Sequence, residues 1–168
     1  MYRRTILRLS VIGSLGCIAR ANHAMSQQKS LKEQLVGAWA YVSSTARLPD
    51  GSPLWGANPK GLMIFTGSGS FSWRIFRSDR PKFASKNRME GTPEENKATL
   101  QGSLTYFGTY SVNETERTIT TVVEESTFPN SEGETLKRVV TRITADTLVY
   151  ENPATTRGER VEAVWQRV

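Results

Sequence analysis

The sequence predicts an all-β fold, an antiparallel up-and-down barrel of eight strands with one helix inserted between the third and the fourth strand. Short segments rich in β-branched and aromatic residues follow one another, and turn residues separate them. The series opens with LVGAW at residues 35–39 and ends with VWQRV at residues 164–168, so the first and last segments both carry a tryptophan. No internal repeat or linker divides the series. We therefore expect one sheet that closes on itself.

The strands are expected at residues 36–46, 61–66, 71–77, 106–112, 118–127, 135–144, 148–151 and 160–168. They lie between turn or connecting segments such as PDGS at residues 49–52 and FPNSEG at residues 128–133. GSGS at residues 67–70 is short enough to join the second and third strands as a hairpin. Because alternate residues of a strand share a face, Trp39 and Tyr41 are expected on the same side of the first strand.

One helix is expected to begin at Pro93, between the third and the fourth strand. Thr92 precedes this proline and Glu95 follows it, which is the pattern of a capping box with proline at the first helical position. The helix is expected to run to about Leu104. The segment before it, residues 79–91, is polar and rich in lysine and arginine, so we expect it to be irregular.

Residues 1–24 have the features of a targeting segment. Basic residues near the start precede an apolar stretch that is too short to span a bilayer, and small residues suited to cleavage follow. We expect this leader to be removed on export to the periplasm or the cell exterior, which leaves a barrel domain at residues 25–168. The alternative is that Met25 is the true start, in which case the protein is cytoplasmic.

The charge of the chain argues against nucleic-acid binding. The sequence has 22 basic and 16 acidic residues, a net charge of +6. The first 24 residues contain 4 of the basic residues and no acidic one, so the remaining chain has 18 basic against 16 acidic residues. A nucleic-acid binder is expected to carry a clustered basic face, which these interspersed charges do not provide.

The single cysteine, Cys17, and the single histidine, His23, both lie in the expected leader. The barrel domain therefore cannot contain a cysteine nucleophile, a serine–histidine–aspartate triad, or a metal site made of cysteine or histidine. No acidic loop with the spacing of an EF-hand is present. We expect no catalytic residue, no metal and no cofactor.

Several segments resemble, in order, a lipocalin-like domain family of small bacterial and fungal β-barrel proteins. They are residues 35–39, 58–65, 77–84, 91–95, 106–110 and 128–130. The resemblance covers nearly the whole barrel domain and implies a lipocalin-type barrel, but the biochemical role of the family is mostly unassigned. It also implies that Arg167 in the last strand covers Trp39, which follows Gly37 in the Gly-x-Trp pattern of true lipocalins.

An eight-stranded barrel leaves an interior that holds side chains or one small ligand. The candidate ligand-binding residues are Tyr41, Arg74, Tyr106, Tyr110, Glu125 and Arg138. Tyr106 and Tyr110 share a strand face, so their hydroxyls point into the cavity if that face is interior; the alternative is core tyrosines bonded to the backbone. Pairing of the fifth and sixth strands is expected to bring Arg138 near Glu124 or Glu125, either as a buried ligand anchor or as a surface ion pair.

Two further groups of residues are expected around the barrel. Those of the irregular segment before the helix are expected to form a lid over the barrel mouth: Arg77, Asp79, Arg80 and Phe83. Those of the first and last strands are expected to pack where the barrel closes: Trp39, Trp165 and Arg167. A buried tryptophan contributes a large apolar area and needs an acceptor for its N–H.

Three functions follow from these observations. The first is a binding module for a small hydrophobic or amphipathic molecule, with no nucleic-acid partner and no integral membrane span. The second is a cyclase- or isomerase-type enzyme in which Tyr106, Tyr110 and a glutamate act as hydrogen-bond donors and general acid or base. The third is a structural protein whose barrel is filled. We expect the first, because the fold suits it and the barrel domain lacks histidine and cysteine.

Overall fold

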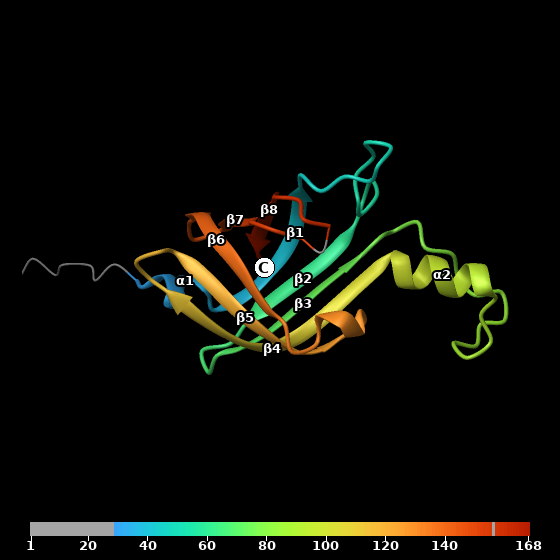
Figure 1. Cartoon of the computed structure of the whole chain (residues 1–168), viewed down its shortest axis with the longest axis horizontal. Helices are drawn as coiled ribbons and strands as arrows, with labels where there is room; N and C mark the ends of the chain where they lie inside the picture. The colour runs from blue at the N-terminus through green and yellow to red at the C-terminus, as the bar shows by residue number, and fades with distance from the viewer. Residues whose placement is uncertain (1–28, 156) are drawn as a thin grey trace, which may run out of the picture.

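The computed structural model describes residues 29–155 and 157–168, and the expected leader and Met25 lie outside these residues. The described strands form one closed antiparallel barrel in chain order (Figure 1). They are β1 (Gly37–Ser44), β2 (Lys60–Phe65), β3 (Ser70–Phe76), β4 (Ser103–Asn113), β5 (Thr118–Ser126), β6 (Thr135–Ile143), β7 (Thr147–Asn152) and β8 (Val161–Arg167). β1 closes the barrel by pairing with β8. The predicted fold class is confirmed, including the helix between β3 and β4.

The inserted helix, α2 (Pro93–Gln101), begins as the sequence predicts. The Thr92 hydroxyl accepts a hydrogen bond from the Glu95 backbone N–H, and the Glu95 carboxylate accepts one from the Thr92 N–H. The helix ends before the expected Leu104, because Gly102 caps it and β4 follows directly. None of its residues is buried, and it extends away from the barrel (Figure 1).

Three β-bulges interrupt the alternation of side chains in the barrel. Each adds one unmatched residue to a strand: Val42 in β1, Glu124 in β5 and Thr141 in β6. The residues that follow a bulge therefore face the opposite side from the one that strict alternation gives. Gly108 of β4 lies beside the second bulge, where a Cβ atom would come within 2.1 Å of the Val122 carbonyl oxygen. Only a glycine allows the two backbones to approach this closely.

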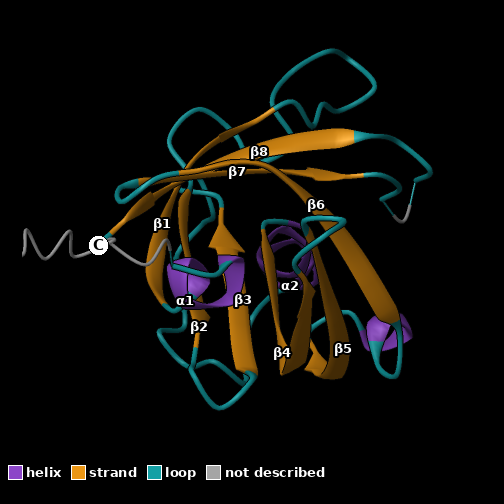
Figure 2. Ribbon diagram, turned by 90° about the vertical axis from the view of Figure 1, so that its left-hand side faces the viewer, coloured by secondary structure: helices purple, strands orange, loops and turns teal. Residues whose placement is uncertain are grey.

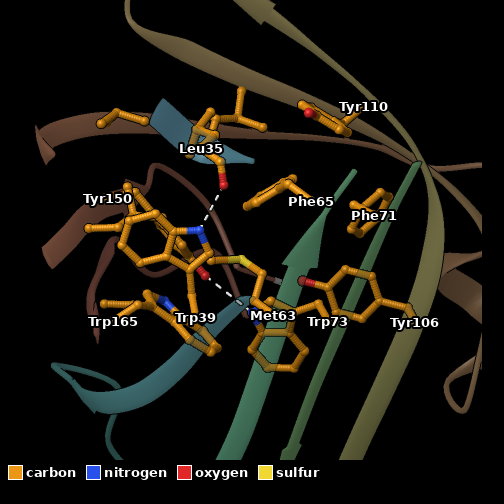
Figure 3. Close-up of a cluster of buried hydrophobic side chains, with 14 of the residues drawn as sticks. Leu35, Trp39, Met63, Phe65, Phe71, Trp73, Tyr106, Tyr110, Tyr150 and Trp165 are labelled. Carbon is orange, nitrogen blue, oxygen red and sulfur yellow. Dashed lines mark hydrogen bonds between the residues drawn. The ribbon is translucent and has the colours of Figure 1, made fainter. Parts of the chain in front are cut away.

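A short helix, α1 (Leu31–Leu35), covers the end of the barrel opposite to α2 (Figure 2). Leu31 and Leu35 are buried in the core, and the Glu114 carboxylate accepts hydrogen bonds from the backbone N–H groups of Leu31 and Lys32. Large side chains fill the interior at this end (Figure 3), among them Trp39, Met63, Phe65, Phe71, Tyr110 and Ile119. This half of the barrel is a packed core.

Candidate ligand-binding pocket

The interior toward the α2 end holds a cavity of about 190 Å³, named here the barrel pocket. Its wall is mainly aromatic and aliphatic. The aromatic members are Tyr41, Trp55, Trp73, Tyr106, Tyr150 and Trp165, and the aliphatic ones include Leu54, Leu104 and Leu136. A concave, largely apolar site with few polar groups is the usual form of a small-molecule site.

The aromatic side chains hold one another in place (Figure 3). Trp73 stacks on Tyr106 with ring centres 5.0 Å apart and an interplanar angle of 21°, and Trp165 stacks on Tyr150 at 6.3 Å and 23°. Tyr41 meets the Trp165 ring edge-on at 5.3 Å. Each aromatic ring of the pocket wall therefore packs against at least one other ring of the wall.

One basic side chain, Arg138 of β6, lies inside the pocket wall. Its Nη1 donates to the carbonyl of Lys137 at 2.8 Å and to Oδ1 of Asn152 at 3.3 Å, and its Nη2 donates to the Tyr106 hydroxyl at 3.5 Å. The guanidinium carbon lies 5.9 Å from the centre of the Tyr150 ring. Burial by itself lowers the pKa of Arg138, but the hydroxyls of Tyr106 and Tyr150 more than offset this and raise the pKa above its ordinary value. The group is therefore charged at every physiological pH.

The hydroxyls of Tyr41 and Tyr106 remain protonated. Burial raises the pKa of Tyr106 to about 12, although the nearby Arg138 charge favours the phenolate. Burial also raises the pKa of Tyr41, whose hydroxyl donates to Ser44 Oγ at 2.8 Å. Tyr106 can therefore donate a hydrogen bond while it accepts one from Arg138.

Two tryptophan N–H groups of the pocket wall differ in whether they have a hydrogen-bond acceptor. The Trp73 indole donates to the Tyr150 hydroxyl at 3.2 Å. The Trp165 indole N–H is buried and has no hydrogen-bond acceptor among the described residues. A buried donor without an acceptor is costly, so this group marks a place where an acceptor is expected.

A family model described as a lipocalin-like domain matches residues 36–168, which span the whole barrel. This chain belongs to the lipocalin-like family. No curated protein matches this lipocalin-like chain at a significant level.

Solved structures with low sequence identity resemble the lipocalin-like barrel. A lipocalin-like protein from Bacteroides uniformis is 17% identical, with a TM-score of 0.45, and the match covers 80% of this chain and 99% of that one. A redesigned β-barrel is 12% identical, also with a TM-score of 0.45, and the match covers 85% of this chain and 99% of that one.

Three of the six candidate ligand-binding residues line the barrel pocket: Tyr41, Tyr106 and Arg138. Tyr110 is interior, but its hydroxyl donates to the Thr66 carbonyl at 2.7 Å in the packed half. Arg74 lies on β3 between the buried Trp73 and Ile75 and so faces the outside of the lipocalin-like barrel. Neither residue reaches the pocket.

The expected pairing of Arg138 with Glu124 or Glu125 is wrong. Arg138 lies opposite Ile119 in β5, and both glutamates are exposed. Strict alternation would turn Glu125 inward together with Val123, but the bulge at Glu124 turns it outward instead. The enzyme alternative needs a glutamate beside the tyrosines, and no glutamate or aspartate lines the described pocket.

Arg142 does not share a face with Arg138. The bulge at Thr141 separates the two arginines, so Arg142 is exposed on the outer face of β6. Strict alternation along β6 would place both on one side. The single guanidinium in the pocket wall is that of Arg138.

The residues expected to form a lid do not cover the pocket. Arg77 pairs with Asp79 through hydrogen bonds of 2.9 and 2.7 Å, and Arg80 donates to the Arg77 carbonyl at 3.0 Å. This segment and Phe83 lead outward to α2, and none of the four residues lines the pocket (Figure 1).

One of the connecting segments that reach the pocket is residues 45–59, named here the mouth loop. Its Leu54 and Trp55 line the pocket, and Trp55 lies 6.2 Å from Trp73 between ring centres. Arg77 holds this loop, because its Nη1 donates to the Leu54 carbonyl at 3.2 Å. Arg77 therefore acts on the mouth indirectly, as an anchor.

The closure residues occupy two places in the barrel. The Arg167 guanidinium lies 4.0 Å from the centre of the Trp39 ring, and the Trp39 indole donates to the Leu35 carbonyl at 2.8 Å, all at the α1 end. Trp165 is fully buried but belongs to the pocket wall as well as to the core.

Sequence reasoning missed three aromatic residues of the pocket: Trp55, Trp73 and Tyr150. Trp73 and Tyr150 lie in expected strands, and their inward facing follows once the strand registers are known. Trp55 gave a signal that could have been used, since a lone tryptophan in a segment with glycine and proline neighbours has no core of its own to join.

None of the helices in residues 29–155 and 157–168 has the length and apolar character that a membrane span requires. The same residues contain no group of three or more acidic side chains arranged to hold a metal ion.

Proposed function

We propose that this lipocalin-like protein binds one small amphipathic molecule in the barrel pocket. The observation that carries the proposal is the pocket itself: an aromatic and aliphatic wall with one half-buried guanidinium and several hydroxyl and N–H groups. The apolar wall suits the body of such a molecule, and the few polar groups suit its head. The packed half below the pocket limits the ligand to a short one.

The first test uses protein purified from its own host. Native mass spectrometry should show a small molecule bound at one per chain, and denaturation should release it for identification. The mass of the chain reports in addition on the proposed leader, because export with cleavage removes about the first 24 residues. A chain that retains those residues would contradict the proposed export.

A pocket-filling variant makes the test specific. Ala163 of β8 lines the pocket and is buried, so Ala163→Leu places an isobutyl group where the ligand would lie. The cavity accepts the added carbon atoms, and we expect stability to stay within about 1 kcal/mol of the parent protein. The matched control is Glu162→Leu, because Glu162 is the exposed neighbour. Ala163→Leu should lose the ligand and Glu162→Leu should retain it; equal occupancy of both variants would contradict binding in the pocket.

A further inference from the structure

We infer that the ligand is an amphipathic monocarboxylate, whose carboxylate binds Arg138 and whose apolar ring or short chain lies against the aromatic wall. This inference rests on the proposed function and adds to it the chemical class of the ligand. Four observations support it: the charge of the pocket, its free donors, the surroundings of Arg138, and the size of the cavity.

The pocket contains a positive charge that no carboxylate balances. The described residues form three ion pairs, and Arg138 takes part in none of them. No aspartate or glutamate lines the pocket. Arg138 is half-buried. A charge that is partly withdrawn from water is costly unless an opposite charge meets it, and an anionic ligand supplies that charge.

The Arg138 guanidinium has one edge that is suitable for binding a carboxylate. Nη1 is occupied by the Lys137 carbonyl and by Asn152, and Nη2 has only the long hydrogen bond to Tyr106. Nε makes no hydrogen bond of full geometry with the described residues, although the Tyr150 hydroxyl lies close enough to the guanidinium to raise its pKa. Nε and Nη2 lie on the same edge of the group, and paired guanidinium donors of this kind bind a carboxylate with two parallel hydrogen bonds.

The other polar groups of the pocket also offer hydrogens. The Tyr150 hydroxyl accepts from Trp73, so its own hydrogen remains to be donated. The Tyr106 hydroxyl accepts from Arg138 and keeps its hydrogen because its pKa is raised to about 12 by burial. Together with the unsatisfied Trp165 N–H, these groups favour a ligand that accepts hydrogen bonds.

A carboxylate fits better than a phosphate. A phosphate monoester carries a charge of about −2 near neutral pH and normally needs more than one cation. The other basic residues of β6, Lys137 and Arg142, are exposed on the outer face and cannot help Arg138. One guanidinium matches one negative charge.

The size of the cavity sets the body of the ligand. A dry apolar cavity of about 150 Å³ in another protein holds benzene, and the barrel pocket measures about 190 Å³. A single ring with a short side chain therefore fills it. Trp73 and Trp165 line the pocket, and aromatic groups prefer stacked or edge-on contacts with such a ring.

The test compares 3-phenylpropionate with its neutral analogue 3-phenyl-1-propanol by isothermal titration calorimetry on the full barrel domain. We expect the acid to bind at least tenfold more tightly than the alcohol at pH 7. Its advantage should disappear as the pH falls below about 4.5, where the carboxyl is protonated. Quenching of tryptophan fluorescence provides an independent signal, because three of the tryptophans line the pocket.

Variants assign the effect to one residue. Arg138→Met should lower acid binding to the level of the alcohol and leave alcohol binding within about twofold, which also shows that the variant is folded. Arg138→Lys should restore part of the preference for the acid. The control Arg142→Met removes an outward arginine of the same strand and should change neither affinity.

Each outcome decides between the two proposals. Equal binding of acid and alcohol to the parent protein overturns the carboxylate inference and leaves the proposed function standing. A preference for the acid that survives Arg138→Met also overturns the inference. Binding of neither compound, or binding unchanged by Ala163→Leu, contradicts the proposed function itself.

Discussion

Replacing Arg167 with methionine should destabilise the barrel by about 3–5 kcal/mol. The guanidinium of Arg167 joins three segments at the α1 end: it donates to the carbonyls of Ala145 at 2.6 Å, of Val36 at 2.9 Å and of Gln34. It also lies over the Trp39 ring at 4.0 Å. These contacts tie β8 to the chain that links α1 to β1, so they hold the seam where the barrel closes.

The magnitude follows from these contacts. A hydrogen bond from a charged group contributes about 1.5–3 kcal/mol, and a cation–π contact contributes about 0.5–2 kcal/mol. The bonds to Val36 and Gln34 are partly buried, and water can replace the exposed bond to Ala145 in the variant. Methionine preserves most of the packing of the side-chain stem. The expected loss is a large share of the roughly 5–15 kcal/mol that stabilises a typical domain.

The assay is urea unfolding followed by tryptophan fluorescence, with Arg160→Met as the control. Arg160 directly precedes β8, but its side chain is 71% exposed and its pair with Glu151 spans 3.3 Å. An exposed pair of this kind contributes at most about 1 kcal/mol. A difference of less than about 1 kcal/mol between the two variants would refute the assigned role of Arg167. Hydrogen exchange should in addition rise at Leu31 and Leu35 in Arg167→Met only.

Three other predictions follow from the structure. Gly108→Ala should cost about 3 kcal/mol or more in urea unfolding, because its methyl group meets a backbone carbonyl, whereas Gly67→Ala, with open space around it, should change stability by less than about 0.5 kcal/mol. Because the pKa of Tyr106 is raised, its contribution to the free energy of unfolding is complete below about pH 10 and is lost as the pH rises toward 12. Over this range the free energy of unfolding of the parent protein should therefore fall by about 2–3 kcal/mol more than that of Tyr106→Phe. Arg77→Met should increase hydrogen exchange in the mouth loop, which it holds through Leu54, while global stability changes by less than about 1 kcal/mol; unchanged exchange would show that the loop is held elsewhere.

The strands and the inserted helix could be predicted because their signals are local. Thr92 and Glu95 form the capping box that their spacing indicates. The requirement for glycine in the Gly-x-Trp pattern comes from a contact between distant segments: Gly37 has φ of +132°, and a Cβ atom there would lie 2.7 Å from Nη1 of Arg167. The glycine thus makes room for the guanidinium that covers Trp39. The glycine of β1 and the arginine of β8 therefore belong to the same packing arrangement.

The side of the barrel on which the polar strand residues lie could not be predicted. A bulge is not recognisable in the pattern of polar and apolar residues of a single strand. Glu125 and Arg142 each follow a bulge, and both face the outside of the barrel. Strict alternation would instead turn Glu125 inward and place Arg142 on the same face as Arg138. Arg138 precedes the bulge in its strand and lies in the pocket wall. The position of the mouth loop depends on contacts between distant segments, such as Arg77 with Leu54, which the sequence does not express locally.

The division of the barrel into a packed half and an open half follows from side-chain size along the closing strands. β1 carries Trp39 toward the α1 end, whereas Ser44 and, just beyond the strand, Ala46 line the pocket; Ala163 of β8 lies opposite Ser44. The bulge at Val42 decides this arrangement, because strict alternation from Trp39 would turn the residues on either side of Ser44 inward instead. Two small side chains that face each other across the seam leave the space that a large pair would fill. The pairing that closes the barrel therefore also sets how large a ligand it can hold.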